Sequence, residues 1–190
     1  RTAMRTCAVS ILVLILAAAA GAEDCAACKP AQVCPAHEGA DDAALKEAAP
    51  LLKDKDLEKR RSGIDRIAEA AGKHLNARSK KITNDLLRMI SDPEPTVKGY
   101  AAERLAECGD EAAAAQTLAA EIAKMEKPIA MEKPSKDADV HKWEEQLRVL
   151  TSFYAGLGRL VTQPVAAAGF EKGIKSSNPW VCKAAAENCK

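Results

Sequence analysis

The most regular pattern of apolar and polar positions in this chain lies between residues 87 and 126. Four apolar side chains recur at intervals of four, four and three residues, which places them on one face of a helix: Val97, Ala101, Leu105 and Cys108. A second apolar stripe follows Gly109 and contains Leu118, Ile122 and Met125. The pattern therefore predicts two consecutive amphipathic helices joined by a short turn.

The turns that bound this pair of helices carry signals of their own. Pro93 and Pro95 fit the first turn of a helix, where a missing N–H costs nothing, and Asp92 is a candidate for the N-cap. Gly109 is predicted to end the first helix in the left-handed conformation. Because two short, alanine-rich helices bury little apolar surface by themselves, they need neighbours of the same kind.

A related segment occurs earlier in the chain. Sliding the segment back by 38 residues aligns Asp54 with Asp92 and Ile67 with Leu105. A spacing close to 40 residues is typical of stacked helical hairpins. The alignment predicts two further helices, which cover the ranges Asp56–Ala71 and Asn76–Ile90.

After residue 125 the helical pattern stops. Pro128 and Pro134 forbid a continuous helix, and the charges around them favour contact with water. We therefore expect a loop over 126–140. It is either an extended connection between repeats or, because long loops in compact domains are often functional, a partner-binding loop.

The C-terminal part of the chain predicts more helices. Apolar residues from Trp143 to Val161 are spaced as one long helix, in which Gly156 and Gly158 either weaken the last turns or let a neighbour approach closely. Three shorter helices are expected elsewhere in the chain, over the ranges 41–52, 165–174 and 179–189.

The central hairpin resembles a HEAT-like repeat. Four features carry the resemblance, in the order and spacing that this family shows: Asp92-Pro93, Val97-Lys98, Ala101-Ala102 followed by Leu105, and Gly109-Asp110. The resemblance implies an all-α fold, a HEAT-like α-solenoid over residues 41–190 that binds another molecule, without indicating which one. The third hairpin departs from the family pattern because it has no Asp-Pro turn.

Composition and the N-terminal residues indicate a compartment. The chain is 47% hydrophobic and only 3% aromatic, which suits helices built from alanine and aliphatic residues. Residues 1–22 look like a secretory signal peptide, with Arg5, an uncharged run from Ala8 to Ala20 and a small-residue cleavage site at Ala20-Gly21-Ala22. We expect export to a periplasm or the cell exterior, with no stable membrane insertion after cleavage.

Residues 23–40 form a predicted irregular segment that contains the candidate metal ligands. Three cysteines and a histidine occur at coordination-like spacing: Cys25, Cys28, Cys34 and His37. They suit a tetrahedral zinc site. In an oxidising compartment the same cysteines suit disulfides, which we expect over zinc, and an unstructured tail is the third interpretation.

The charge distribution suggests where a partner binds. Lys53 to Arg88 carries eleven basic and six acidic residues, whereas Ala102 to Glu126 carries two basic and six acidic ones. These are either two solvated faces or a basic docking surface for an acidic partner. The residues that would contribute to that surface are Arg60, Arg61, Arg78, Lys80, Lys81 and Arg88.

The function predicted from sequence is an exported protein-interaction or scaffold module whose partner is another protein. The chain lacks a G-x-S-x-G motif, an H-E-x-x-H motif and a phosphate-binding loop, so we expect neither catalytic activity nor a cofactor. Without the signal peptide, 26 basic residues face 27 acidic ones, which does not favour nucleic acid. The alternative is a zinc-binding or redox-active protein that uses the N-terminal cluster.

Overall fold

The part of the chain that the structure describes is all-helical. The computed structural model describes residues 43, 45–72 and 80–189, and within these ranges it contains no β-strand. Helical turns cover 45–51. The helices that follow are α3 (Leu57–Gly72), α4 (Lys80–Met89), α5 (Pro95–Cys108), α6 (Glu111–Glu126), α7 (Asp137–Gly158), α8 (Pro164–Ile174) and α9 (Pro179–Asn188). The all-α prediction is therefore confirmed.

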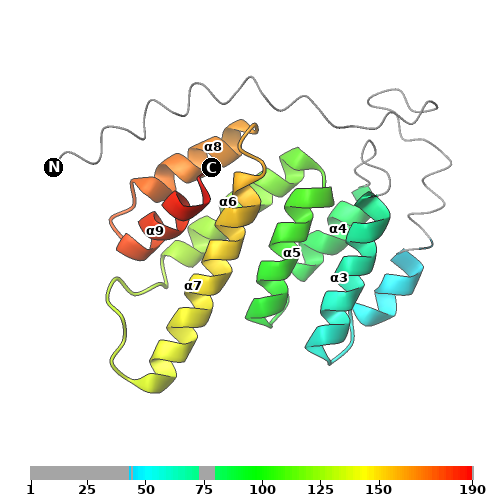
Figure 1. The fold of residues 1–190 in the computed structure, drawn as a ribbon, viewed down its shortest axis with the longest axis horizontal. Helices are drawn as coiled ribbons and strands as arrows, with labels where there is room; N and C mark the ends of the chain where they lie inside the picture. The colour runs from blue at the N-terminus through cyan, green and yellow to red at the C-terminus, as the bar shows by residue number, and fades with distance from the viewer. Residues whose placement is uncertain (1–42, 44, 73–79, 190) are drawn as a thin grey trace.

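The helices form two layers. α3, α5 and α7 lie side by side in the first layer (Figure 1), and α9 packs against α7. α4, α6 and α8 form the second layer, in which α6 contacts both of its neighbours. Each helix of the second layer also packs on the helix that follows it in the chain, so the apolar faces of the two layers are buried against each other.

The apolar stripes predicted from the sequence form this interior. Val97, Ala101 and Leu105 of α5 are fully buried, and Leu118 of α6 is buried with them. Cys108 is buried at the end of the α5 stripe, and its Sγ–H donates to the carbonyl oxygen of Arg104. The period of 3.6 residues therefore identifies the buried face correctly in this hairpin.

Three predictions about the turns around α5 are wrong. Pro93 lies before the N-cap of the helix, so only Pro95 is in its first turn. The N-cap of α5 is Glu94, which makes no side-chain capping bond, and Asp92 instead accepts from the Glu94 N–H at 2.8 Å. Gly109 ends α5 at φ −80° and ψ 171°, an extended conformation and not a left-handed one. The extended residue leads directly into Asp110, whose side chain caps α6 by accepting from the Ala113 N–H.

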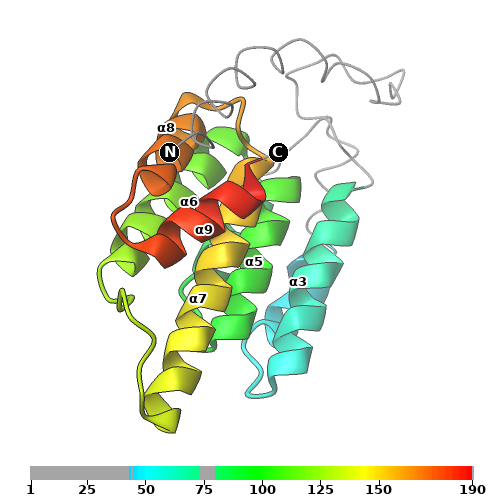
Figure 2. The ribbon, with the colours of Figure 1, turned by 60° about the vertical axis from the view of Figure 1, so that its left-hand side comes forward.

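The longest helix, α7, starts earlier than its apolar spacing indicates. It begins at Asp137 and ends at Gly158, so the loop before it covers 127–136 and not 126–140. Val161 lies beyond the helix and is 44% exposed, although it was predicted to continue the apolar stripe. In both views the N-terminal end of α7 extends past the neighbouring end of α5 (Figures 1 and 2).

The loop over 127–136 is attached to two helices, contrary to the expectation that its charges keep it in water. Ile129 is buried, and its carbonyl oxygen accepts from Asn178 Nδ2 at 2.9 Å. Trp143 Nε1 donates to the carbonyl oxygen of Ala130 at 3.2 Å, and Trp180 Nε1 donates to the carbonyl oxygen of Met131 at 3.0 Å. The two indole rings meet edge to face, with centroids 4.9 Å apart.

The predicted signal peptide and the predicted cysteine-rich segment lie outside the described residues. Among the helices that the structure describes, none combines the length and the apolar character that a membrane crossing requires. Cys182 and Cys189 form no disulfide with each other.

Candidate functional site

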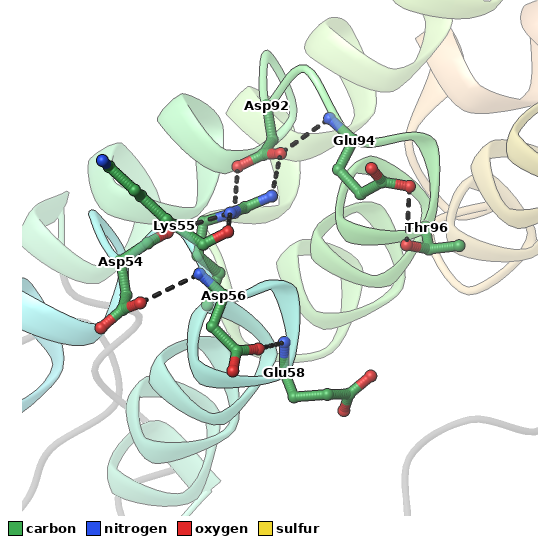
Figure 3. Close-up of polar contacts among 8 residues, drawn as sticks. Asp54, Lys55, Asp56, Glu58, Asp92, Glu94 and Thr96 are labelled. Carbon is green, nitrogen blue, oxygen red and sulfur yellow. Dashed lines mark hydrogen bonds and ion pairs between the residues drawn. The ribbon is translucent and has the colours of Figure 1, made fainter.

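The two acidic turns of the first layer have the same local structure. We call residues 54–58 the first acidic turn and residues 92–96 the second acidic turn. In the first, Asp54 accepts from the Asp56 N–H at 2.9 Å (Figure 3). In the second, Asp92 accepts from the Glu94 N–H at 2.8 Å. A short side chain that accepts two residues further on fixes a tight turn, which explains why aspartate occurs at both positions.

Arg60 of α3 joins the two acidic turns. Its Nε lies 2.9 Å from Asp92 Oδ2, and its Nη2 donates to Asp92 Oδ1 at 3.2 Å. Its Nη1 donates to the carbonyl oxygens of Asp54 and Lys55 at 2.9 and 3.1 Å. The side chains of Arg60 and Asp92 are only 12% and 6% exposed. A planar guanidinium with five donors suits this arrangement, in which carboxylate and carbonyl groups surround the charge.

Four of the residues predicted to form a basic docking surface are described by the structure, and they lie on α3 and α4, in different layers. Arg60 is engaged inside the fold, as described above. Arg61 pairs with Glu58 at 3.3 Å and lies over the ring of Tyr100, 4.9 Å from its centroid. On α4, in the other layer, Arg88 pairs with Asp85 and Lys81 is exposed.

Two further members of the predicted surface are not placed by the structure. Arg78 lies outside the described residues. Lys80 begins α4, but the structure does not describe its side chain. Partner binding by this group of six residues therefore stays a prediction.

The candidate metal ligands Cys25, Cys28, Cys34 and His37 also lie outside the described residues. Within 43, 45–72 and 80–189, no group of three or more histidine, cysteine, aspartate or glutamate side chains is placed to hold a metal ion. The zinc and disulfide interpretations of the N-terminal cluster both stay predictions.

A polar network on α3 and α5 centres on Tyr100. The Tyr100 hydroxyl donates to Asp65 and accepts from Arg104 Nη2 at 3.0 Å. Arg61 and Arg104 both place their guanidinium groups near its ring, at 4.9 and 5.1 Å from the centroid. Burial and the bond to Asp65 raise the pKa of Tyr100, and the bond to Tyr100 raises the pKa of Arg104. The network links α3 to α5.

Two members of this network, Arg61 and Tyr100, form part of one wall of a groove between α5 and α7. A cavity of about 200 Å³ lies on this side, and we call it the arginine cavity because Arg61 and Arg148 line it. Gly99 lies at its floor, where a Cβ would be 3.1 Å from both Cβ and Oγ of Ser152. The missing side chain at 99 therefore lets α5 and α7 approach each other closely.

A second cavity, of about 320 Å³, is also lined by α5 and α7, and in addition by α6. We call it the lysine cavity because Lys98 and Lys142 line it. The two cavities share Pro95, Glu145 and Val149 in their walls, so they adjoin each other, and we call the two together the groove between α5 and α7.

Apolar side chains from α5, α6, α7 and the segments before α5 and α7 complete the walls of the lysine cavity. They are Ile90, Pro95, Met125, Pro128, Val149 and Phe153. Such a mixture of apolar walls and a few charged groups is typical of binding sites.

Several charged side chains of the groove have no partner among the described residues. Lys98, Lys142, Glu145 and Arg148 make no side-chain hydrogen bond or ion pair with any described residue. Elsewhere on α5 to α8 many charges are paired, as in Arg104 with Glu107 and Lys172 with Glu126. The groove therefore offers unpaired charges of both signs beside apolar walls.

The sequence gives one indirect signal for this groove. The absence of an Asp-Pro turn before the third hairpin marks the place where the repeated arrangement changes, but it does not identify the side chains that line the cavities. Their positions depend on the length of α7 and on the path of the 127–136 loop, which are set by contacts with distant residues.

Comparison of the chain with protein-family models, with curated proteins and with solved structures finds no match.

Proposed function

We propose that this chain is a HEAT-like α-solenoid that acts as an exported protein-interaction or scaffold module, and that the groove between α5 and α7 is its binding surface. The solenoid interpretation is supported by the recurrence of the acidic turn, at Asp54 and at Asp92, ahead of helices that lie side by side. Export rests on the sequence of residues 1–22.

The observation that carries the binding function is the set of unpaired charges in the groove. Lys98, Lys142, Glu145 and Arg148 surround a concave, partly apolar surface and form no hydrogen bond or ion pair with one another. Leaving charges unpaired beside apolar walls contributes little to folding, whereas a partner that supplies complementary groups gains affinity and specificity from them. Stacked helical hairpins characteristically present extended surfaces of this kind.

Site-specific photo-crosslinking tests the proposal. A photoreactive residue placed at Thr96, which is exposed and lines the arginine cavity, should give a discrete adduct when the full chain is expressed in its native envelope fraction. The matched control carries the same group at Ala168 on α8, an exposed position outside both cavities. Mass spectrometry then identifies the adduct. Equal adducts from both positions, or none from Thr96, would argue against a binding groove.

A further inference from the structure

Lys98 occupies in α5 the position that Arg60 occupies in α3. Each is the fourth residue of its helix, because α3 begins at Leu57 and α5 at Pro95. Arg60 reaches the carboxylate of the second acidic turn, because its Nε lies 2.9 Å from Asp92 Oδ2. Lys98 lines the lysine cavity together with Pro128, which lies in the segment that precedes α7.

The turn before α7 has no aspartate at the position that Asp54 and Asp92 occupy before α3 and α5. Asp54 and Asp92 each stand three residues before a first-layer helix, and Pro134 stands at the corresponding place before α7. In addition, α7 has 22 residues whereas α5 has 14, and its N-terminal end extends past α5 (Figures 1 and 2). The extra turns carry the 127–136 loop away, toward α9, where Asn178 and Trp180 bind its carbonyls.

The lysine cavity lies where the acidic turn would otherwise reach Lys98. Lys98 is half-buried, so its ammonium group loses part of its hydration without gaining a partner among the described residues. Lys142 supplies a second unpaired cation in the same cavity, and Glu121, which also lines it, is already paired with Lys124 at 2.5 Å. The lysine cavity therefore contains a cation, Lys98, that corresponds to Arg60, but no carboxylate that pairs with it as Asp92 pairs with Arg60.

We propose that a partner protein completes this ion pair by placing an aspartate or glutamate side chain in the lysine cavity, against Lys98 and Lys142. An apolar side chain next to that carboxylate packs against Met125 and Pro128, and Glu145 accepts from backbone N–H groups of the bound segment. The recognised chemistry is therefore an extended acidic-apolar peptide segment. This inference rests on the proposed interaction function and names the part of the partner that the groove recognises.

The test uses a peptide that copies this chain's own second acidic turn, Ile-Ser-Asp-Pro-Glu-Pro-Thr, with a fluorescent label. Fluorescence anisotropy with the full chain should show saturable binding, and Lys98→Glu should weaken it by about tenfold or more, since close charge pairs at interfaces are coupled by amounts of at least that size. Lys46→Glu, at an exposed position remote from the cavity, is the matched control and should bind as the parent does.

Charge reversal in the peptide separates recognition from a general loss of folding. A peptide with lysine in place of its aspartate should bind Lys98→Glu more tightly than it binds the parent. Lys142→Glu, which alters an exposed side chain, gives the same comparison if Lys98→Glu does not fold. The inference is overturned if no peptide binds the folded parent, or if both peptides bind all variants equally. Should Thr96 still crosslink to a partner in that case, the interaction function stands and only the acidic-segment inference fails.

Discussion

Gly156 of α7 lies directly against the backbone carbonyl group of Ala102 in α5. A Cβ at position 156 would be 2.9 Å from that oxygen and 3.1 Å from Leu118 Cδ1, so this contact between the helices requires glycine. Of the two roles predicted for Gly156, the close approach of a neighbour is the one that the structure supports. This contact and the one at Gly99 fix the separation of α5 and α7, and hence the shape of the groove beside them.

Gly156→Ala should therefore lower the free energy of unfolding by about 1–3 kcal/mol, because a backbone oxygen cannot move aside as a side chain does. Gly169→Ala in α8 is the matched control. Its Cβ would meet Leu157 Cδ2 at 3.0 Å, the end of a flexible side chain, and alanine favours a helix by up to about 1 kcal/mol. Urea denaturation should show opposite shifts for the two variants, and equal losses would contradict the contact described.

Asp92→Ala should be strongly destabilising. It leaves the Arg60 guanidinium buried without its carboxylate, and breaking a buried pair in this way costs about 3–5 kcal/mol. Adding Arg60→Met should recover part of the loss, which a double-mutant cycle measures by thermal or urea unfolding. Glu171→Gln, in the exposed pair with Lys175, is the control and should leave stability unchanged. Additive effects of Asp92→Ala and Arg60→Met would show that the two residues do not interact.

Asn178 should tolerate neither alanine nor aspartate. Its Oδ1 accepts from the Trp180 N–H at 3.0 Å and its Nδ2 donates to the Ile129 carbonyl at 2.9 Å, while the residue itself is buried. Asn178→Ala removes both bonds and should cost about 1–3 kcal/mol. Asn178→Asp keeps the cap but sets an anionic oxygen against the carbonyl oxygen of Ile129. The loss of stability in this variant should therefore become smaller as the pH falls and the carboxyl group is protonated. Thermal melts at pH 7 and pH 4, relative to the parent at each pH, compare the variants.

The protein should lose stability as the pH rises above 10, and Tyr154 should contribute to this loss. Burial, followed by the charge of Glu126 beside its hydroxyl, raises the pKa of Tyr154 well above its ordinary value of 10.0. The unfolded chain therefore loses the phenolic proton first, and the contribution to stability is complete below pH 10 and declines as the pH rises above it. Tyr154→Phe should reduce this decline in urea titrations between pH 9 and pH 11. An unchanged slope would show that other groups cause it.

The sequence predicts the parts of this fold that depend on local spacing. The stripe from Val97 to Leu105 follows from helical periodicity alone, and the spacing of 38 residues correctly pairs Asp54 with Asp92. The ion pair of Asp92 is not predictable in the same way, because its partner is Arg60, which lies 32 residues earlier in the chain. Propensity identifies a turn but not the charge that approaches it from another helix.

The residues of the candidate site are harder to predict from local spacing. Lys98 and Lys142 lie on different helices, and nothing in their local sequence indicates that one cavity contains both. The N-terminal end of α7 was misplaced because its first turns, from Asp137 onward, are polar and exposed, so they carry no apolar period. Helical turns that project beyond their neighbours bury nothing, and apolar periodicity detects only turns that are buried.

The attachment of the 127–136 loop affects how the protein can fold. Asn178 and Trp180 each bond to a carbonyl 49 residues earlier, so α9 gains these contacts only after a long loop has closed. Stacked hairpins usually fold by nearest-neighbour contacts, and hairpins can then be added or removed one at a time. Here the last two helices, the loop and Trp143 should instead exchange their amide hydrogens as one cooperative unit. Deleting α8 and α9 would expose Trp143 and release the loop, so the C-terminal hairpin is not a removable repeat.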